Sequence, residues 1–127
     1  MKFLKFSIGN EFFGVDINKV DEVVEKTEIT RIPNSPAEVE GVMDLRGETV
    51  TITNPKIIFD ITGGQEDTVI VLGNQSNKGW VVNKVEEVMD IDENDIDSVL
   101  TNSESGISGI VKTENEFITI VDLIEIS

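Results

Sequence analysis

The chain of 127 residues contains no cysteine and no histidine. Without cysteine it can form neither disulfides nor thiolate metal sites, and it has no cysteine nucleophile. Histidine is the commonest general base and the commonest transition-metal ligand, so its absence argues against most enzymatic mechanisms. Catalysis by two carboxylates stays open in principle, but the spacing of the 25 acidic residues singles out no pair. We therefore expect no catalytic residue, no metal site and no cofactor.

Positive charge is also scarce. Only 10 Lys and Arg residues stand against 25 Asp and Glu residues, which gives a net charge of −15 at pH 7. Binding to nucleic-acid phosphates, or to an anionic membrane surface, needs a cationic face. We therefore predict no nucleic-acid partner and expect a protein partner instead. The acidic surface can equally serve solubility or suit a salty cytoplasm.

Long hydrophobic runs are missing as well. No apolar stretch approaches the length that a bilayer requires, which predicts no direct membrane insertion. Residues 1–8 lack the apolar core and the small-residue cleavage site of a signal peptide, so we expect a cytoplasmic protein. The length and the hydrophobic content of 39% fit a single domain, or two very small units sharing a core.

The chain does contain many short alternating segments that are typical of β-strands. The predicted strands span residues 4–8, 12–17, 48–53, 68–72, 79–83 and 117–126, and residues 107–111 are a further apolar stretch. Two segments, 18–25 and 84–89, fit either a helical turn or a strand that continues past a bend, and the spacing of their valines leans towards a short helix. Prolines predict an extended loop over residues 30–36. The fold class is therefore all-β with minor short helices.

The sequence repeats itself. Residues 14–23 align with residues 79–88 at a constant offset of 65, with Gly, Asn, Lys, Val, Glu and Val identical. A fainter match at offset 68 relates residues 50–54 to residues 118–122. We interpret this as a single domain with two copies of one β unit, approximately 1–62 and 66–127 and either intertwined or sequential, that share a third core. Closing each unit into a small barrel would remove exposed strand edges, and a groove would remain at the junction.

The candidate working surface is the segment from Gly41 to Gly47, with the sequence GVMDLRG. Glycine tolerates positive φ and close backbone approach, so the two glycines predict two sharp bends with a short strand between them. Arg46 would then lie at a rigid corner, where an arginine is well suited to recognition. The simpler alternative is an ordinary hairpin with a solvated arginine.

An acidic loop at residues 90–97 begins like a calcium-binding loop of the EF-hand type. It has Asp95 where that motif needs glycine and Thr101 where it needs a bidentate glutamate, so a solvated loop is the default interpretation. A β-barrel protein that binds calcium or a small ligand through this loop remains the alternative function. Trp80 lies within an apolar segment and is expected in the core.

These residues together resemble the CheW family of chemotaxis coupling proteins. The resemblance covers nearly the whole chain, and its most specific part is GVMDLRG, close to the family's Gly-Val-Ile-Asn-Leu-Arg-Gly. Other matching segments are FSIG at 6–9, FGVDI at 13–17, VDEV at 20–23, IP at 32–33, Pro36, VIV at 69–71, GWVVN at 79–83, GI at 109–110 and IVD at 120–122. The family fold consists of two five-stranded barrels with a groove between them.

The resemblance implies a non-catalytic adaptor that couples the cytoplasmic tips of methyl-accepting chemoreceptors to the regulatory domain of the histidine kinase CheA. By position, the receptor-binding residues would be Val20, Glu22, Gly41, Leu45, Arg46 and Gly47. The kinase-binding surface would lie near Val82 and Val85. The chain departs from the family at residues 51–56, where a Pro-Val-Ile-Asp-Leu-Arg segment is common, and at Asp44 and Asn83, which replace Asn and Asp.

Overall fold

The computed structural model describes residues 1–73, 77–98 and 106–122. Two five-stranded sheets contain all ten strands of this part of the chain, which confirms the predicted all-β fold class. The strands are β1 (Lys2–Ile8), β2 (Glu11–Asp16), β3 (Val20–Glu25), β4 (Val39–Leu45), β5 (Glu48–Thr53), β6 (Thr68–Leu72), β7 (Lys78–Val82), β8 (Lys84–Asp90), β9 (Ile107–Lys112) and β10 (Phe117–Val121). The helical segments are the 3₁₀ turns Ile17–Lys19 and Glu93–Asp95 and the helix α1 (Pro55–Phe59).

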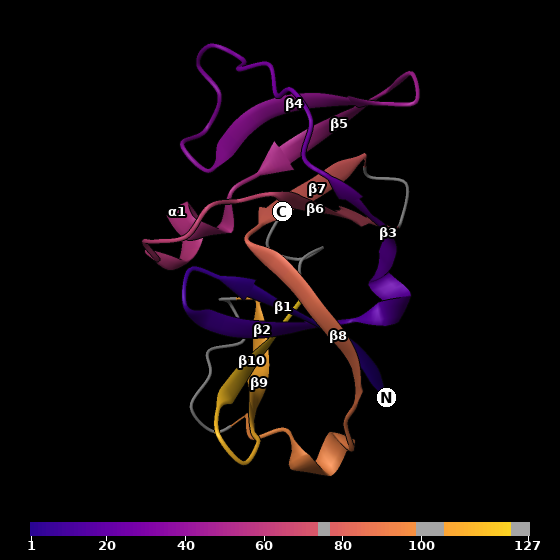
Figure 1. Ribbon diagram of the computed structural model, residues 1–127, viewed down its shortest axis with the longest axis vertical. Coiled ribbons are helices and arrows are strands. Elements are labelled where there is room, and N and C mark those ends of the chain that lie inside the picture. The colour runs from indigo at the N-terminus through magenta and orange to yellow at the C-terminus, as the bar shows by residue number, and fades with distance from the viewer. Residues whose placement is uncertain (74–76, 99–105, 123–127) are drawn as a thin grey trace.

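The two sheets have matching strand orders. Sheet 1 runs β8-β1-β2-β10-β9, and sheet 2 runs β3-β6-β7-β5-β4. In each sheet the two central antiparallel strands come from one half of the chain, and the remaining three come from the other half. The chain therefore passes between the sheets, and in Figure 1 the long strand β8 crosses from the upper sheet to the lower one.

Each sheet curls so that its two edges approach each other. A single isolated bridge joins Thr30, which follows β3, to Val42 on β4, and the equivalent bridge in sheet 1 joins Asp97 to Ile110. In both bridges the two residues exchange backbone hydrogen bonds of 2.8–2.9 Å. The units are therefore curled sheets closed at one point, and not the continuous barrels that were predicted. The bridges occupy part of the exposed edges that a flat sheet would present.

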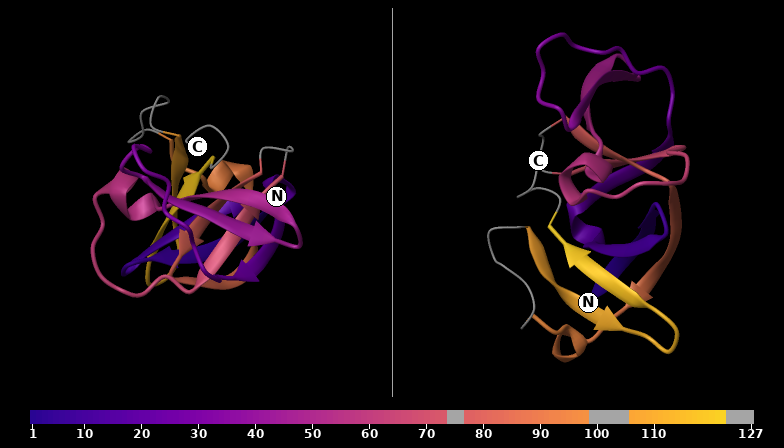
Figure 2. Two further views of the ribbon diagram at one scale, coloured as in Figure 1. Left: turned by 90° about the horizontal axis from the view of Figure 1, so that it is seen from above. Right: turned by 90° about the vertical axis from the view of Figure 1, so that its left-hand side faces the viewer.

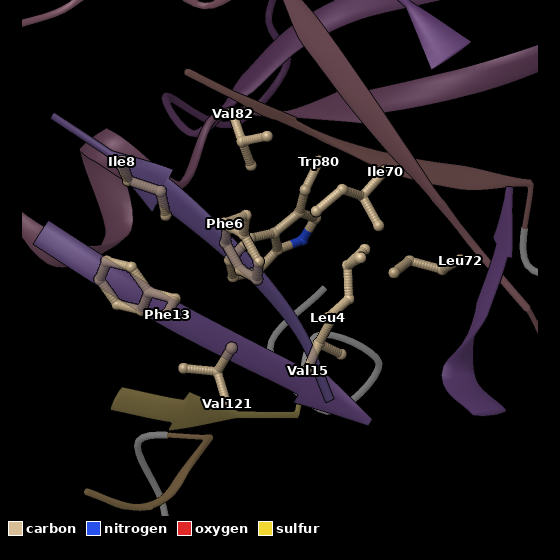
Figure 3. Close-up of a cluster of buried hydrophobic side chains, with 10 residues drawn as sticks. All are labelled: Leu4, Phe6, Ile8, Phe13, Val15, Ile70, Leu72, Trp80, Val82 and Val121. Carbon is tan, nitrogen blue, oxygen red and sulfur yellow. The ribbon is translucent and has the colours of Figure 1, made fainter. Parts of the chain in front are cut away.

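The hydrophobic residues form three clusters. One lies within sheet 2 around Met43, Val50 and Ile52, and another lies within sheet 1 around Phe3 and Ile118. The third is shared between the sheets, as the internal repeat predicted, and Figure 3 shows its side chains converging from strands of both sheets. Its ten buried members are Leu4, Phe6, Ile8, Phe13, Val15, Ile70, Leu72, Trp80, Val82 and Val121.

Trp80 is the largest residue of this shared core and is fully buried, as expected. Phe59 at the end of α1 packs edge-on against it, with the ring centres 6.0 Å apart, and stacks on Phe13 at 5.3 Å. Such aromatic contacts add about 0.5–1.5 kcal/mol each beyond the burial of their area. Helix α1 therefore helps to seal the junction between the sheets, on the left-hand side of Figure 1.

Two segments predicted to favour a short helix are strands instead. Residues 20–25 form β3, with only the 3₁₀ turn Ile17–Lys19 before it, and residues 84–90 form β8. Both are edge strands, and in β3 half-buried residues alternate with exposed ones. The half-buried positions of β3 alternate and include Val20 and Val24, as expected for an edge strand, so the preference for a helix was wrong.

The remaining boundaries agree closely with the prediction, with β6 at the predicted residues and the first hairpin within two residues of them. The stretch after Asn54 is helical, because the Asn54 side chain accepts a hydrogen bond from the Lys56 amide and Pro55 begins the first turn. The motif position Thr101 lies outside the described residues, and the last predicted strand, 117–126, lies partly outside them.

Candidate partner-binding groove

The β4–β5 hairpin ends in a two-residue turn made by Arg46 and Gly47. Leu45 and Glu48 lie opposite each other, and the two turn residues have φ angles of 52° and 87°. These values match the type I′ turn that suits the twist of a hairpin. Asp44 reinforces the turn, because its Oδ1 accepts a 3.0 Å hydrogen bond from the Gly47 amide. Arg46 is therefore held at a defined corner, as predicted.

Gly41 has a different role from the predicted bend. It lies inside β4 at a shift of register between β4 and β5, with φ at +149°. A Cβ atom there would lie 2.1 Å from the carbonyl oxygen of Thr30. Glycine is therefore required for the close approach that closes sheet 2. Only one true turn is present in this segment, at Arg46 and Gly47.

Arg46 reaches from the hairpin tip to the opposite edge of sheet 2. Its Nη2 donates a hydrogen bond to Oε1 of Glu22 on β3, and the two groups form an ion pair. The Arg46 side chain is 69% exposed and that of Glu22 is 29% exposed. In Figure 1 the hairpin tip and β3 lie on the same, right-hand side of the molecule. The pair therefore spans the opening of the curled sheet.

Beneath this ion pair lies a groove of about 670 Å³. We call it the Arg46 groove, and its lining residues are Asp21, Glu22, Leu45, Arg46, Glu48, Val50, Val71, Leu72, Gly73 and Asn77. Val50, Val71 and Leu72 are buried core residues and supply an apolar base. Three carboxylates and one guanidinium supply the charged surroundings. An apolar base with a few fixed polar groups is typical of a binding site.

The carboxylates around Arg46 all raise the pKa of its guanidinium. The hydrogen bond and the charge of Glu22 raise the pKa of the guanidinium, and Asp21 and Glu48 add to this effect. Arginine is charged at any physiological pH, so the shift changes no protonation state. It does show that all three carboxylates lie close to the guanidinium.

The structure brings only some of the predicted receptor-binding residues to the groove. Glu22, Leu45 and Arg46 line it, and Gly47 shapes the turn that presents Arg46. Gly41 is buried in β4 and acts through the backbone. Val20 does not line the groove, and it packs half-buried against the shared core.

The two predicted kinase-binding residues lie on or next to the shared core. Val82 has no exposed surface, so its side chain cannot touch a partner directly in this structure. Val85 is half-buried on the edge strand β8 and packs against the same core. Of the pair, only Val85 is accessible.

Sequence reasoning missed several residues of the groove. Glu48 could have been found, because a two-residue turn places it opposite Leu45. Asp21 was missed because the predicted residues of this segment came from the family resemblance, which indicated only Val20 and Glu22. Val71 and Asn77 come from the other half of the chain, and only the exchange of strands between the sheets brings them here.

The acidic loop lines a second hollow, of about 510 Å³, to which Asp90, Asp95 and Asp97 contribute. Asp92 caps the 3₁₀ turn by accepting a 2.9 Å hydrogen bond from the Asn94 amide, and Asp90 lies 3.5 Å from the N-terminal amine of Met1. Among the described residues, which include all of 90–98, no group of three or more acidic side chains is placed to hold a metal ion. The described residues also include no helix long and apolar enough to span a membrane.

Comparison with known proteins gives a consistent result. The profile of the CheW-like domain family matches residues 2–127. The chemotaxis protein CheW of Thermotoga maritima is 29% identical, over 94% of this chain and 83% of that protein. The CheW of Helicobacter pylori is also 29% identical, over 99% of this chain and 81% of that protein.

A solved structure supports the same relationship. The crystal structure of the scaffolding protein TtCheW from Thermoanaerobacter tengcongensis superimposes with a TM-score of 0.85. The two chains are 35% identical, and the match covers 96% of this chain and 84% of the other. At this identity and coverage, the likeness extends to the sequence as well as to the fold.

Proposed function

The chain belongs to the family of CheW-like domains, and from this premise we propose that it is a non-catalytic adaptor that couples chemoreceptors to the histidine kinase CheA. The relatives named above are a chemotaxis protein and a scaffolding protein, which supports a role in assembly. The absence of cysteine and histidine from the sequence removes the commonest catalytic groups and agrees with this role. We place the protein in the cytoplasm, beside the receptor tips.

The Arg46 groove is our proposed receptor-binding site. The observation that carries this assignment is the position of Arg46, held by a type I′ turn at the opening of an apolar groove. A fixed guanidinium loses less conformational entropy on binding than one on a mobile loop. Val20 and Gly41 contribute indirectly in this proposal, by positioning β3 and β4 around the groove.

The kinase would bind elsewhere, which an adaptor requires if both partners are to be held at once. We propose the exposed edge of β8 around Val85 for the regulatory domain of CheA. Val88 on the same strand is 51% exposed and adds apolar surface there. Val82 supports this surface from the core and makes no direct contact.

Replacing Arg46 by Glu tests the receptor site. The variant places a carboxylate beside Glu22 and removes the guanidinium, so we expect receptor fragments to lose binding to it. The variant should fold normally, because the Arg46 side chain is 69% exposed and exposed ion pairs contribute little to stability. The measurement is co-sedimentation with receptor arrays and kinase, with circular dichroism as the check on folding.

Arg31 offers a matched control, because the chain has only two arginines. Arg31 is also exposed and does not line the groove. The change Arg31→Glu alters the net charge by the same amount and should leave co-sedimentation intact. Equal binding by the Arg46 variant and the wild type would contradict the proposed receptor site.

The calcium-binding alternative is less well supported, because Asp90 pairs with the N-terminal amine, Asp92 caps a 3₁₀ turn, and no group of three acidic side chains among the described residues is placed to hold a metal ion. A calorimetric titration with calcium gives a direct comparison of the two functions. We expect no heat beyond that of dilution.

A further inference from the structure

The Arg46 groove carries more negative charge than its own residues neutralise. Arg46 pairs with Glu22, but in the described part of the chain no ion pair is formed by Asp21 or Glu48. Both residues are exposed, so leaving them unpaired carries no desolvation cost. The three carboxylates and one guanidinium leave two negative charges around the opening.

The internal repeat provides a comparison within the same molecule. Val71 on β6 lies opposite Glu22, and the equivalent residue of sheet 1 is Lys5 on β1, which lies opposite Glu87. Likewise Glu48 begins β5, and at offset 68 its counterpart Glu116 precedes β10. The two sheets therefore present the same backbone positions with different side chains.

In sheet 1 the counterpart of Glu48, Glu116, has its charge neutralised. Lys5 forms an ion pair with Glu116 and is only 12% exposed. Its Nζ atom also lies 4.3 Å from the centre of the Phe12 ring, where it gains a cation–π contact. One of the chain's ten cations is therefore used to neutralise Glu116, whereas Glu48 forms no ion pair with any described residue.

This asymmetry matters because the whole chain is acidic, with a net charge of −15. A groove whose lining has a net charge of one sign attracts a partner of the opposite sign. Uncompensated charges beside an apolar base therefore favour cationic partners and reject acidic ones.

We propose that the Arg46 groove selects a receptor segment that carries lysine or arginine side chains facing Asp21 and Glu48. This inference rests on the proposed adaptor function and names the partner chemistry of the same site. Asp21 and Glu48 are then specificity-determining residues, while Glu22 stays engaged with Arg46. The apolar part of the segment rests on Val50, Val71 and Leu72.

The test is a calorimetric titration of a receptor cytoplasmic fragment into the wild type and into the double variant Asp21→Asn with Glu48→Gln. Both changes keep side-chain size and lie on exposed positions, so the fold should be preserved. We expect the double variant to bind about tenfold more weakly and to lose part of the salt dependence. Unchanged or tighter binding would overturn the proposal.

A second double variant, Glu11→Gln with Glu25→Gln, changes the net charge equally at two exposed positions outside the groove. It should bind as the wild type does. Tenfold weakening in this control as well would mean that overall charge, and not the groove, determines affinity, and would also overturn the proposal.

A peptide experiment separates this proposal from the adaptor function. Two synthetic amphipathic peptides, identical except for Lys or Glu on the polar face, are titrated into the labelled protein. The Lys peptide alone should shift the NMR resonances of the groove residues, and equal shifts with both peptides would overturn the proposal. If the receptor fragment fails to bind the wild type, the adaptor function fails, while the peptides still test the charge preference.

Discussion

Gly41 and Gly47 bracket the same hairpin segment, but glycine is required at the two positions for different physical reasons. A Cβ atom on Gly41 would lie 2.1 Å from the Thr30 carbonyl oxygen, a backbone atom that cannot move without breaking the bridge to Val42. A Cβ atom on Gly47 would meet nothing within 4 Å. The first glycine is needed for space and the second only for its positive φ.

We predict that Gly41→Ala lowers the free energy of unfolding by about 3 kcal/mol or more, because the clash adds to the backbone strain. Gly47→Ala should cost only about 1 kcal/mol, the usual penalty for a left-handed alanine. Urea denaturation monitored by the fluorescence of Trp80, the single buried tryptophan, measures both values. Similar losses in the two variants would contradict the assigned roles.

Arg46 shows how far the position of a single residue can be predicted from the sequence. The glycine beside it and the strand after it were enough to predict a rigid corner, because a type I′ turn depends on local sequence. Its partner Glu22 lies 24 positions away, and the ion pair between them depends on the curl of the whole sheet. The corner was therefore predictable, whereas the groove beneath it was not.

At the scale of elements, β3 and β8 were mistaken for short helices for the same reason. Residues 20–25 contain valines at three- and four-residue spacing, which a helix and an edge strand both accommodate. Residues 20–25 form a strand because they pair with β6, and residues 84–90 form a strand because they pair with β1. Since each pairing joins residues from different halves of the chain, no local pattern could identify it.

The connector between α1 and β6 is held by an ion pair whose strength depends on pH. Glu66 lies in this connector, 3.0 Å from Nζ of Lys56 on α1. Burial alone would raise the pKa of Glu66, but the hydrogen bonds and charge of Lys56, together with other hydrogen bonds, hold it below the ordinary 4.5. A lowered folded-state pKa stabilises the protein above pH 4.5, and the stabilisation is lost as the pH falls through the folded-state pKa.

We therefore predict that Glu66→Gln destabilises the fold by about 0.5–1 kcal/mol at pH 7, since the pair is largely but not fully buried. Below the folded-state pKa of Glu66 the wild type and the variant should converge, because the wild-type carboxyl is then protonated. Urea denaturation at a series of pH values from neutral to acidic measures the difference. A difference that stays constant over this range would contradict the ionic role of Glu66.

At the scale of the whole molecule, the internal repeat predicted the arrangement of the fold better than the individual strand predictions did. The offset of 65 relates β2 to β7 and β3 to β8, and these strands occupy equivalent places in the two sheets. The shared core followed from the same reasoning, because neither unit is large enough to bury its own surface. Figure 2 shows the two sheets stacked end to end around that core. The repeat left open whether the two units are intertwined or sequential, since a repeat records similarity and not pairing, and the structure shows strands exchanged between the sheets.

The net charge of −15 predicts how the whole molecule responds to salt. Repulsion among the acidic side chains opposes the compact state, and it weakens as the Debye length falls from about 30 Å at 0.01 M salt to about 8 Å at 0.15 M. We expect the free energy of unfolding to rise by roughly 1 kcal/mol over this range, measured with urea because urea is uncharged.

Sodium and potassium chloride should act equally, because screening depends on ionic strength and not on the identity of the ion. Calcium chloride at the same ionic strength should not raise the free energy of unfolding further in a way that saturates at low concentration. A specific calcium site at the acidic loop would give such an increase. A fall in stability with salt would instead mean that the internal ion pairs, such as Lys5 with Glu116, outweigh the repulsion.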